Sequence, residues 1–315
     1  MQKIIHFDTF SGFGGFTLAL ERVYANNREL LSSQTAEDIQ GLLSEPLGGQ
    51  ARTIGFSEID KYASAVLKYH WPNIKNYGDI TKINWSEVPD FDLLTGGSPC
   101  QDLSIAGKRN GLAGSRSGLF YEYIRALESK KPKYFIWENV KGALSSNKGF
   151  DFTAVLNAFS EAGYSLWWQV LNAKDFGVPQ NRERIFVVGF RDQPAPEVFF
   201  EREDDGRNNK TYENKSGERK GFRSGDISAC VNTRFGSTAR GQQLINNEEL
   251  KIRRLTPTEC ERLMGLPDDH LKYGINEKGE QFEISDSQKY KMAGNGVVVN
   301  VVEEIIKNII LLSAE

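Results

Sequence analysis

The sequence predicts an α/β fold in which helices flank a mixed, mostly parallel β-sheet, together with a second, smaller domain. Up to residue 190, short apolar runs rich in β-branched and aromatic residues alternate with helical patterns, as is typical of parallel sheets. A glycine-rich turn joins the first apolar run to the first helical pattern. After residue 191 the alternation stops, and charged residues, glycine and asparagine predominate, which indicates a change of domain.

The expected elements follow one another in a regular order. Strands are expected at residues 3–7, 52–57, 91–95, 134–137 and 185–190. Helices are expected at residues 14–24, 61–69, 118–130, 151–162, 255–265 and 296–312. Residues 26–51 interrupt the order and are expected to form an inserted loop or short helix. We therefore expect a main domain of residues 1–191 and 282–315, and a small domain of residues 192–281.

The composition is that of an ordinary globular protein, with 39% hydrophobic and 26% charged residues in a chain of 315. The longest apolar stretch, residues 305–312, contains a lysine and an asparagine, so no membrane span is expected. A strand so close to the N-terminus leaves no room for a signal peptide. The three cysteines lie far apart and form no CxxC pair, which predicts neither disulfides nor a metal site and fits a reducing cytoplasm.

The net charge of −3 argues mildly against a protein that binds nucleic acid, because a surface that binds phosphates must be basic. The local distribution of charge along the chain differs, however, from the net charge. Residues 207–240 contain eight lysines and arginines but only three acidic residues. A basic region on an acidic body is compatible with nucleic-acid binding.

The glycine turn at residues 7–15 follows a strand and begins a helix. Such turns let the backbone approach a nucleotide-like ligand and present N–H groups to it. A dehydrogenase fingerprint would need a third glycine where Thr17 stands, which disfavours a dinucleotide fold. Glu58 ends the second strand, where an acidic residue can bind a ribose diol, and Asp79 follows the next strand-like piece. A plain strand-to-helix turn remains an equal alternative at this point.

Cys100 lies just past the carboxyl end of an apolar strand, the edge where open α/β sheets place their active sites. A polar loop follows at residues 102–117, with glycines and basic residues that could close over a substrate and contact phosphates. A single cysteine is more often a small buried hydrophobic residue. Pro99 before it and the basic loop after it favour a reactive thiol here.

Five motifs together resemble those of the bacterial and phage DNA cytosine-5 methyltransferases, in the same order and with similar gaps. They are residues 10–15 (FSGFGG), 99–101 (PCQ), 138–140 (ENV), 180–184 (QNRER) and 294–296 (GNG). A block at residues 254–268 matches as well, and only residues 26–51 and about 192–249 fall outside the resemblance. The resemblance implies a Rossmann-like S-adenosylmethionine-dependent methyltransferase fold, with the main domain as the catalytic domain and residues 192–281 as a target-recognition domain.

The resemblance also implies catalytic roles. Cys100 would add to C6 of a flipped-out cytosine, and Glu138 would hydrogen-bond N3 and the exocyclic amine. Arg184 would hold the cytosine O2, and Arg182 would support the loop or the phosphates. For the two arginines a solvated strand end is the alternative, more so for Arg182. No residue is indicated as the base that removes the C5 proton, and ordered water could serve.

For the methyl donor, S-adenosylmethionine, the resemblance implies a set of residues that contact the adenine, the ribose and the methionine part. Phe10 would stack near the adenine, which Asp79 and Ile80 would recognise, and Ile59 stands where the family often has a larger side chain. A helix is expected to start directly after Asn295, so Asn295 and Gly296 are predicted at its entrance. The complete predicted set is Phe10, Ser11, Gly12, Phe13, Gly14, Gly15, Glu58, Ile59, Asp79, Ile80, Pro99, Asn295 and Gly296.

DNA contacts are expected from the loop after Cys100 and from the recognition domain. Ala106 is too small to fill the gap left by a flipped base, so the recognition domain should contribute. Arg234 and Arg240 are expected in a groove, with phosphate contact as an equal alternative, and the short domain suggests a short target sequence. The predicted set is Gln101, Ser104, Ala106, Lys108, Arg109, Thr233, Arg234 and Arg240.

The predicted function is therefore methylation of cytosine C5 within a specific short duplex DNA sequence. The chain would be the modification methylase of a restriction–modification system, with a companion endonuclease, or an orphan or phage methylase. It is expected to act as a cytoplasmic monomer in a bacterial or phage-infected cell, without a metal. One alternative is a tRNA cytosine-5 methyltransferase, because a tRNA-modifying relative shares these motifs. An inactive DNA-binding module would have lost Cys100, Glu138 or Arg184, and all three are present.

Overall fold

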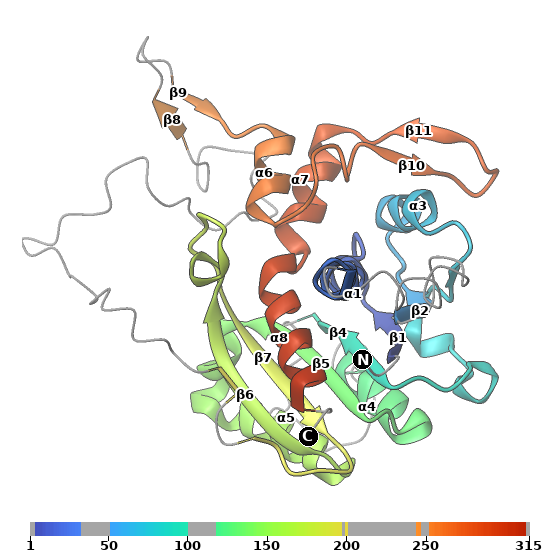
Figure 1. Cartoon of the computed structure of the whole chain (residues 1–315), viewed down its shortest axis with the longest axis vertical. Coiled ribbons are helices and arrows are strands. Elements are labelled where there is room, and N and C mark those ends of the chain that lie inside the picture. The colour runs from blue at the N-terminus through green and yellow to red at the C-terminus, as the bar shows by residue number, and fades with distance from the viewer. Residues whose placement is uncertain are drawn as a thin grey trace, which may run out of the picture.

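A seven-stranded sheet forms the centre of the molecule, seen in a computed structural model that describes residues 4–32, 51–99, 118–196, 199–200, 244–246 and 252–312 (Figure 1). Its strand order is β3-β2-β1-β4-β5-β7-β6. Neighbouring strands are parallel from β3 through to β5, whereas β7 runs antiparallel to both β5 and β6. The strands are β1 (Ile4–Thr9), β2 (Ala51–Ser57), β3 (Lys75–Asn76), β4 (Leu93–Gly96), β5 (Tyr134–Val140), β6 (Ser165–Asn172) and β7 (Glu183–Phe190).

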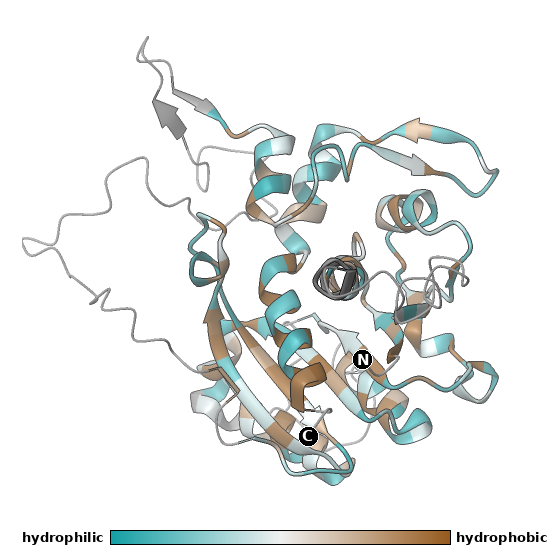
Figure 2. Ribbon diagram, viewed as in Figure 1, coloured by the Kyte–Doolittle hydropathy of each residue, from teal (hydrophilic) through white to brown (hydrophobic). Residues whose placement is uncertain are grey.

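Helices cover both faces of this sheet. The side chains of β5 alternate between them: Tyr134 and Ile136 pack in one cluster with α1, α3 and α8, while Phe135 and Trp137 pack in another with α4 and α5. Burial on both faces explains why the inner strands β5 and β7 are largely apolar in the sequence, as the colouring in Figure 2 shows. The helices are α1 (Gly15–Ser32), α3 (Lys61–His70), α4 (Gly118–Lys130), α5 (Phe150–Glu161), α6 (Pro257–Leu263), α7 (Asp286–Asn295) and α8 (Val299–Leu312).

The remaining elements are short. They are the hairpins β8 (Leu244–Asn246) with β9 (Ile252–Arg254) and β10 (Tyr273–Ile275) with β11 (Gln281–Glu283). The 3₁₀ turns are Ile80–Lys82, Trp85–Glu87, Lys141–Leu144, Ser146–Gly149 and Ala173–Phe176. Among the described helices, none combines the length and the apolar character that crossing a membrane requires.

The α/β fold with a mostly parallel sheet is confirmed, but the expected end of the first helix and the expected start of the last helix are wrong. The first helix does not end at residue 24 but continues to Ser32, so the interruption predicted at residues 26–51 is shorter. The last helix does not begin at Gly296 but at Val299. Gly296 instead caps the unpredicted helix α7, in an extended conformation with φ −76° and ψ 172°, which separates the two helices. Strand β6 was also not predicted.

The C-terminal part of the chain packs back onto its beginning. Arg22 of α1 and Glu303 of α8 form an ion pair of 3.0 Å, and buried residues of α6 and α8 share one apolar cluster with α1. Leu271 and Ile284 belong to the same cluster. Residues 252–281, which we assigned to the small domain, therefore lie partly in the apolar core of the main domain. The boundary at residue 281 stays a prediction.

Candidate active site

A cavity of about 470 Å³ opens beside the carboxyl ends of β1, β2, β4 and β5. Residues from both ends of the chain line it. Of the thirteen residues predicted for the methyl donor, twelve lie in its wall, and so do Glu138 and Arg184. The twelve are Phe10, Ser11, Gly12, Phe13, Gly15, Glu58, Ile59, Asp79, Ile80, Pro99, Asn295 and Gly296.

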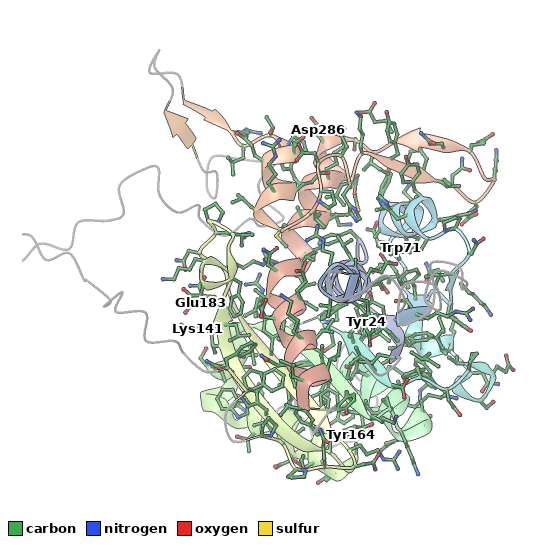
Figure 3. All side chains as sticks on the ribbon, in the orientation of Figure 1. Tyr24, Trp71, Lys141, Tyr164, Glu183 and Asp286 are labelled. Atoms are coloured by element: carbon green, nitrogen blue, oxygen red, sulfur yellow. The ribbon has the colours of Figure 1, made fainter. Side chains whose placement is uncertain are left out.

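Gly14 is the predicted donor residue that lies outside this lining. Its φ is +84°, and a Cβ there would overlap the ring of Trp71, the residue that caps α3 and that Figure 3 labels. The role of Gly14 is thus the close approach of the turn to the end of α3. Thr17, where a dehydrogenase would have glycine, is fully buried and hydrogen-bonded to Asp8.

The glycine turn is fixed by hydrogen bonds from three directions. Ser11 Oγ donates to the carbonyl oxygen of Asp8 at 2.7 Å, and the Ser11 N–H donates to the carbonyl of Ser57 at 3.3 Å. Phe10 and Gly12 have φ angles of 51° and 53°. A positive φ is unfavourable for phenylalanine and persists only where the surroundings enforce it. The turn is therefore held in one shape before any ligand arrives.

Glu58 connects this turn to the end of β2. Its Oε2 accepts a hydrogen bond from the Gly12 N–H at 2.8 Å, and its Oε1 accepts one from the Asp60 N–H at 2.7 Å. Asn76 of β3 holds the backbone of Glu58 on both sides, through its N–H and its carbonyl. Burial raises the pKa of Glu58, and the N–H groups of Asp60 and Gly12 oppose that rise. The carboxylate is fixed in place with its remaining lone pairs available to a ligand.

Asp79 and Ile59 lie at the rim of the cavity. Asp79 caps the turn Ile80–Lys82 and accepts hydrogen bonds from the N–H and the hydroxyl of Thr81, which lower its pKa. Ile80 beside it is buried. The Ile59 side chain is 77% exposed, so a large apolar surface faces solvent next to the cavity.

Glu138 and Arg184 form an ion pair on the opposite wall. The Nε of Arg184 lies 3.0 Å from Oε1 of Glu138, and the two side chains are only 18% and 15% exposed, respectively. They come from neighbouring antiparallel strands, because Val140 of β5 pairs with Arg184 of β7. Burial raises the pKa of Glu138, while the charges of Arg184 and, less strongly, Arg182 lower it. Glu138 is thereby more prone to hold a proton than an exposed glutamate.

The backbone that leads to Cys100 packs tightly against Glu138. A Cβ at Gly97 would lie 2.9 Å from Oε2 of Glu138. Asn139 Nδ2 donates to the carbonyl of Ser98 at 3.0 Å, and Trp137 Nε1 donates to Ser98 Oγ at 3.2 Å. The chain is thus fixed as far as Pro99, which lines the cavity. Of the remaining predicted residues, the following lie outside the described part of the chain: Cys100, Gln101, Ser104, Ala106, Lys108, Arg109, Thr233, Arg234 and Arg240.

Arg182 is buried, so the alternative of a solvated strand end is wrong. Its Nη2 donates to the carbonyl of Gly294 at 3.0 Å and to that of Gly296 at 2.6 Å. These two hydrogen bonds connect the residue just before β7 to the junction between α7 and α8. Arg182 does not line the cavity and instead supports the Gly-Asn-Gly turn that does.

Asn295 and Gly296 lie at the end of α7, and the prediction that they open a helix is wrong. A Cβ at Gly296 would overlap the ring of Phe13, and a Cβ at Gly15 would lie 2.8 Å from Val297. The glycine turn and the Gly-Asn-Gly turn, about 280 residues apart in sequence, therefore pack directly against each other. Their contact forms one side of the cavity.

The Gly296→Ala variant should be destabilised and should bind S-adenosylhomocysteine weakly. Alanine fits the backbone angles of Gly296, so the expected cost is the overlap with Phe13, which is about 1–3 kcal/mol for overpacking. Urea unfolding and calorimetric titration measure the two effects. Gly118→Ala is the matched control, because a Cβ at Gly118 meets nothing within 4 Å. If the two variants were equally stable and bound S-adenosylhomocysteine equally well, the close contact of Gly296 with Phe13 would be contradicted.

Two charged residues are among the cavity residues that were missed from the sequence. Lys291 of α7 donates to Oδ2 of Asp60 at 2.7 Å, and both residues line the cavity next to the glycine turn. Lys291 is one helical turn before Asn295, but that spacing becomes meaningful only once α7 is known. Asp60 is the N-cap of α3, a signal that the pattern Asp60-Lys61-Tyr62 offers in the sequence.

Comparisons with known proteins identify the family of this chain. The family model of the C-5 cytosine-specific DNA methylases matches residues 4–216 and 199–311. The chain is 32% identical to the type II methyltransferase M.NlaX of Neisseria lactamica, over 97% of this chain and 95% of that protein. It is 40% identical to the orphan methyltransferase M.Rho11sI of Bacillus phage rho11s, over 61% of this chain, but this match spans only 34% of the phage enzyme's own length.

Solved structures of methyltransferases share the fold. The Dnmt2 methyltransferase of S. pombe superposes with a TM-score of 0.68 at 18% identity, covering 99% of this chain and 100% of that one. A putative DNA modification methyltransferase of an E. coli prophage gives 0.63 at 19% identity, covering 99% and 100%. The chain belongs to the C-5 cytosine-specific DNA methylase family, and the predicted family and fold are confirmed. The enzyme class of this family is DNA (cytosine-5-)-methyltransferase, as predicted.

Proposed function

We propose that the chain transfers a methyl group from S-adenosylmethionine to C5 of a flipped-out cytosine within a short duplex DNA sequence, through a covalent bond between Cys100 and C6. The observation that carries this proposal is the shared cavity. The Glu138–Arg184 pair forms one wall and the glycine turn with Glu58 forms another. Pro99, directly before Cys100, lies in the same lining.

The cavity suits S-adenosylmethionine by its donor set and by its size. The fixed Glu58 carboxylate can accept hydrogen bonds from a ribose diol, and Asp79 can accept one from an adenine amine. Phe10 and Ile80 supply apolar surface for the adenine ring. A volume of about 470 Å³ is within the usual range for sites that bind a small cofactor. When bound, the donor supplies an electrophilic methyl group.

The catalytic residues act on the cytosine ring, whose C5 is a poor nucleophile until the ring is activated. The Cys100 thiolate forms the S–C6 bond, the electron pair of the C5–C6 double bond becomes available at C5, and protonated Glu138 donates its proton to N3. Arg184 holds both Glu138 and the cytosine O2. After C5 is methylated, loss of the C5 proton restores the double bond, Cys100 leaves as thiolate and N3 returns its proton to Glu138.

Burial of Glu138 supports this role. A carboxylate with an ordinary pKa would be ionised at neutral pH and unable to donate to N3. The raised pKa favours the proton-bearing form, while Arg184 keeps the carboxylate from becoming permanently neutral. The group is thereby poised to give up a proton and to take it back.

DNA recognition is assigned to the loop after Cys100 and to the small domain. Because residues 252–281 and Phe199 both contribute to the core of the main domain, we place the sequence-reading part between residues 201 and 251. Gln101, Ser104, Ala106, Lys108 and Arg109 would contact the flipped base and its phosphates. Thr233, Arg234 and Arg240 would contact the groove.

The biological setting is proposed from the relatives. Among them are type II methyltransferases and orphan phage methyltransferases. We propose a monomer that acts on duplex DNA in the cytoplasm of a bacterial or phage-infected cell, without a metal, either beside a restriction endonuclease or alone. The second candidate substrate is tRNA.

The test is incubation of the chain with tritium-labelled S-adenosylmethionine and either duplex DNA or tRNA. Label is expected in the DNA, and bisulfite sequencing of that DNA should show methylcytosine within one short sequence. Label in tRNA alone would overturn the proposed substrate. Methylcytosine scattered without regard to sequence would overturn the role assigned to the small domain.

A further inference from the structure

A closed ring of five polar side chains lies buried next to the glycine turn. It consists of His6 and Asp8 of β1, Thr17 of α1, Thr53 of β2 and Thr95 of β4. His6 Nδ1 lies 2.8 Å from Thr53 Oγ1, and its Nε2 lies 2.7 Å from Thr95 Oγ1. Thr95 Oγ1 is 3.0 Å from Asp8 Oδ1, while Thr17 Oγ1 is 3.2 Å from Asp8 Oδ2 and 3.3 Å from Thr53 Oγ1. None of the five lines the cavity.

The ring contains one hydrogen bond more than can be formed with the hydrogens of three threonines, a neutral histidine and an ionised aspartate. Its five contacts need five hydrogens. The three threonine hydroxyls supply three, and a neutral imidazole supplies one. If Thr95 and Thr17 both donate to an ionised Asp8 and Thr53 donates to Thr17, both nitrogens of His6 must donate and His6 is an imidazolium. If Asp8 is a carboxylic acid, it donates to one of the two threonines and a neutral His6 completes the ring. In both cases the ring binds one proton more than a neutral imidazole and a carboxylate would, and its total charge is zero.

Burial decides where that proton resides. All five side chains are buried, and a buried charge is costly unless an opposite charge lies beside it. Burial raises the pKa of Asp8 to about 8, although hydrogen bonds from Thr95 and Thr17 oppose the rise. Burial alone lowers the pKa of His6 to about 3. The raised pKa of Asp8 and the lowered pKa of His6 both favour a proton on Asp8, as a carboxylic acid, over a second proton on His6.

The charged and titratable groups around Asp8 do not supply a counter-charge. On the β2 side, Glu58 adds a further upward contribution to the pKa of Asp8. On the helix side, Tyr123 of α4 is fully buried, and the charge of Asp8 contributes to raising its pKa. An ionised Asp8 would therefore meet a further negative charge at Glu58, and the neutral Tyr123 offers it no positive charge.

The ring connects the three strands that carry the proposed donor site. β1 leads into the glycine turn, β2 ends next to Glu58, and β4 leads through Gly97 to Pro99. Backbone contacts extend the ring to the turn: the Asp8 carbonyl accepts from Ser11 Oγ, and the Thr95 carbonyl accepts from Thr9 Oγ1 at 2.7 Å. The ring adds a side-chain connection across β2, β1 and β4.

We infer that Asp8 is held as a neutral carboxylic acid in a ring with His6, and that this ring positions the strand ends that carry the donor site. His6 and Asp8 are positioning residues, since neither touches the cavity. The positioning of the donor site rests on the proposed function, whereas the protonation of Asp8 can be tested without it.

The decisive variant is Asp8→Asn, because an amide has the same shape as a carboxylic acid and likewise offers one acceptor and a donor to the ring. At pH 6 it is expected to melt at or above the melting temperature of the parent protein, because Asp8 of the parent ionises only in the unfolded state at this pH. The pKa of Asp8 is raised from 3.8 to about 8 in the folded state, so the folded state binds more protons between these values. The parent protein therefore loses stability as the pH rises through this window, and the variant does not.

The melting temperature of Asp8→Asn should thus rise relative to the parent between pH 6 and pH 8.5. The control is Asp90→Asn, at an exposed carboxylate that pairs with Lys130, where no such pH-dependent difference is expected. An Asp8→Asn variant that is strongly destabilised at pH 6, with a difference that does not shift with pH, would show that Asp8 is ionised and would overturn the inference.

Imidazole ¹⁵N NMR tests the state of His6. The chain has only three histidines, so the His6 signals can be assigned from their loss in a His6→Gln variant. They should report a neutral ring that does not titrate between pH 5.5 and 7.5. An imidazolium spectrum in this range would place the extra proton on His6 and overturn the assignment to Asp8.

Thr95→Val tests the positioning role, because it opens the ring while keeping a β-branched side chain in the strand. Its affinity for S-adenosylhomocysteine should fall at least about tenfold, with no comparable loss for the control Thr153→Val, at an exposed residue of α5 outside the ring and the cavity. Unchanged affinity in Thr95→Val would overturn the positioning role. Absence of binding by the parent protein would instead overturn the proposed donor site and leave the NMR and melting results valid.

Discussion

Replacement of Cys100 by serine is expected to reduce methyl transfer to the background of the assay. The proposed reaction begins with a thiolate, and a serine hydroxyl is far too weakly acidic to form the corresponding nucleophile without a base beside it. Binding of S-adenosylhomocysteine should stay within about twofold, because the donor site is formed by other residues. Tritium transfer to duplex DNA measures the first effect and calorimetric titration measures the second.

Cys260 provides the control for a general effect of removing a thiol. It is 1% exposed within the apolar cluster near α6 and α8, and burial raises its pKa to about 12. A thiol in that state is an inert packing group. Cys260→Ala should therefore retain methyl transfer. Activity that survives in Cys100→Ser would exclude Cys100 as the nucleophile.

The Glu138→Gln variant is expected to lose about 10²–10⁴-fold in kcat, the usual contribution of a positioned acid–base group. Glutamine keeps the size of the side chain but cannot pass a proton to N3. The raised pKa of Glu138 also predicts a pH effect, because the protonated form is needed and is lost as the pH rises through that pKa. The alkaline decline of kcat that Glu138 causes should be absent from the variant. Single-turnover rates across pH 6–9 measure both effects.

Glu183→Gln is the matched control for that substitution. Glu183 is on β7, next to Arg184 in sequence, and pairs with Lys141 at 2.9 Å on the surface, where Figure 3 shows the two labelled side chains together. Exposed pairs of this kind contribute little to stability. The control should keep the kcat and pH profile of the parent protein. A similar loss in both variants would indicate damage to the β5–β7 region in place of lost proton transfer.

The parts of the donor site that depend on local sequence could be predicted. A strand, a glycine turn and a helix in direct succession identify residues 10–15, and an acidic residue at the end of the next strand identifies Glu58. The same logic identified Glu138. In each case the residue lies where its own strand ends, and open α/β sheets place their sites at those ends.

The contributions of α7 could not be predicted, because its sequence does not show a clear apolar stripe. Only Lys289, Met292 and Ala293 of this helix are buried, and one of them is charged. Without α7, Asn295 and Gly296 were assigned to the following helix and Lys291 was overlooked. Arg182 was misjudged for a related reason, since its partners Gly294 and Gly296 lie more than 100 residues away.

The ring around His6 was equally hidden in the sequence. Its members become neighbours only through the strand order β2-β1-β4, which hydrophobic patterns do not specify. A histidine and three threonines within apolar strands show no spacing that links them. Side chains of this kind can be related to one another only after the sheet is assembled.

The cavity is lined by the glycine turn and by the junction that follows α7, two segments about 280 residues apart in the sequence. Every strand of the central sheet precedes α7 in the chain. A nascent chain that contains the whole sheet therefore still has only one side of the cavity. Contacts between such distant segments also slow folding, so the cavity should be among the last parts of the fold to be completed.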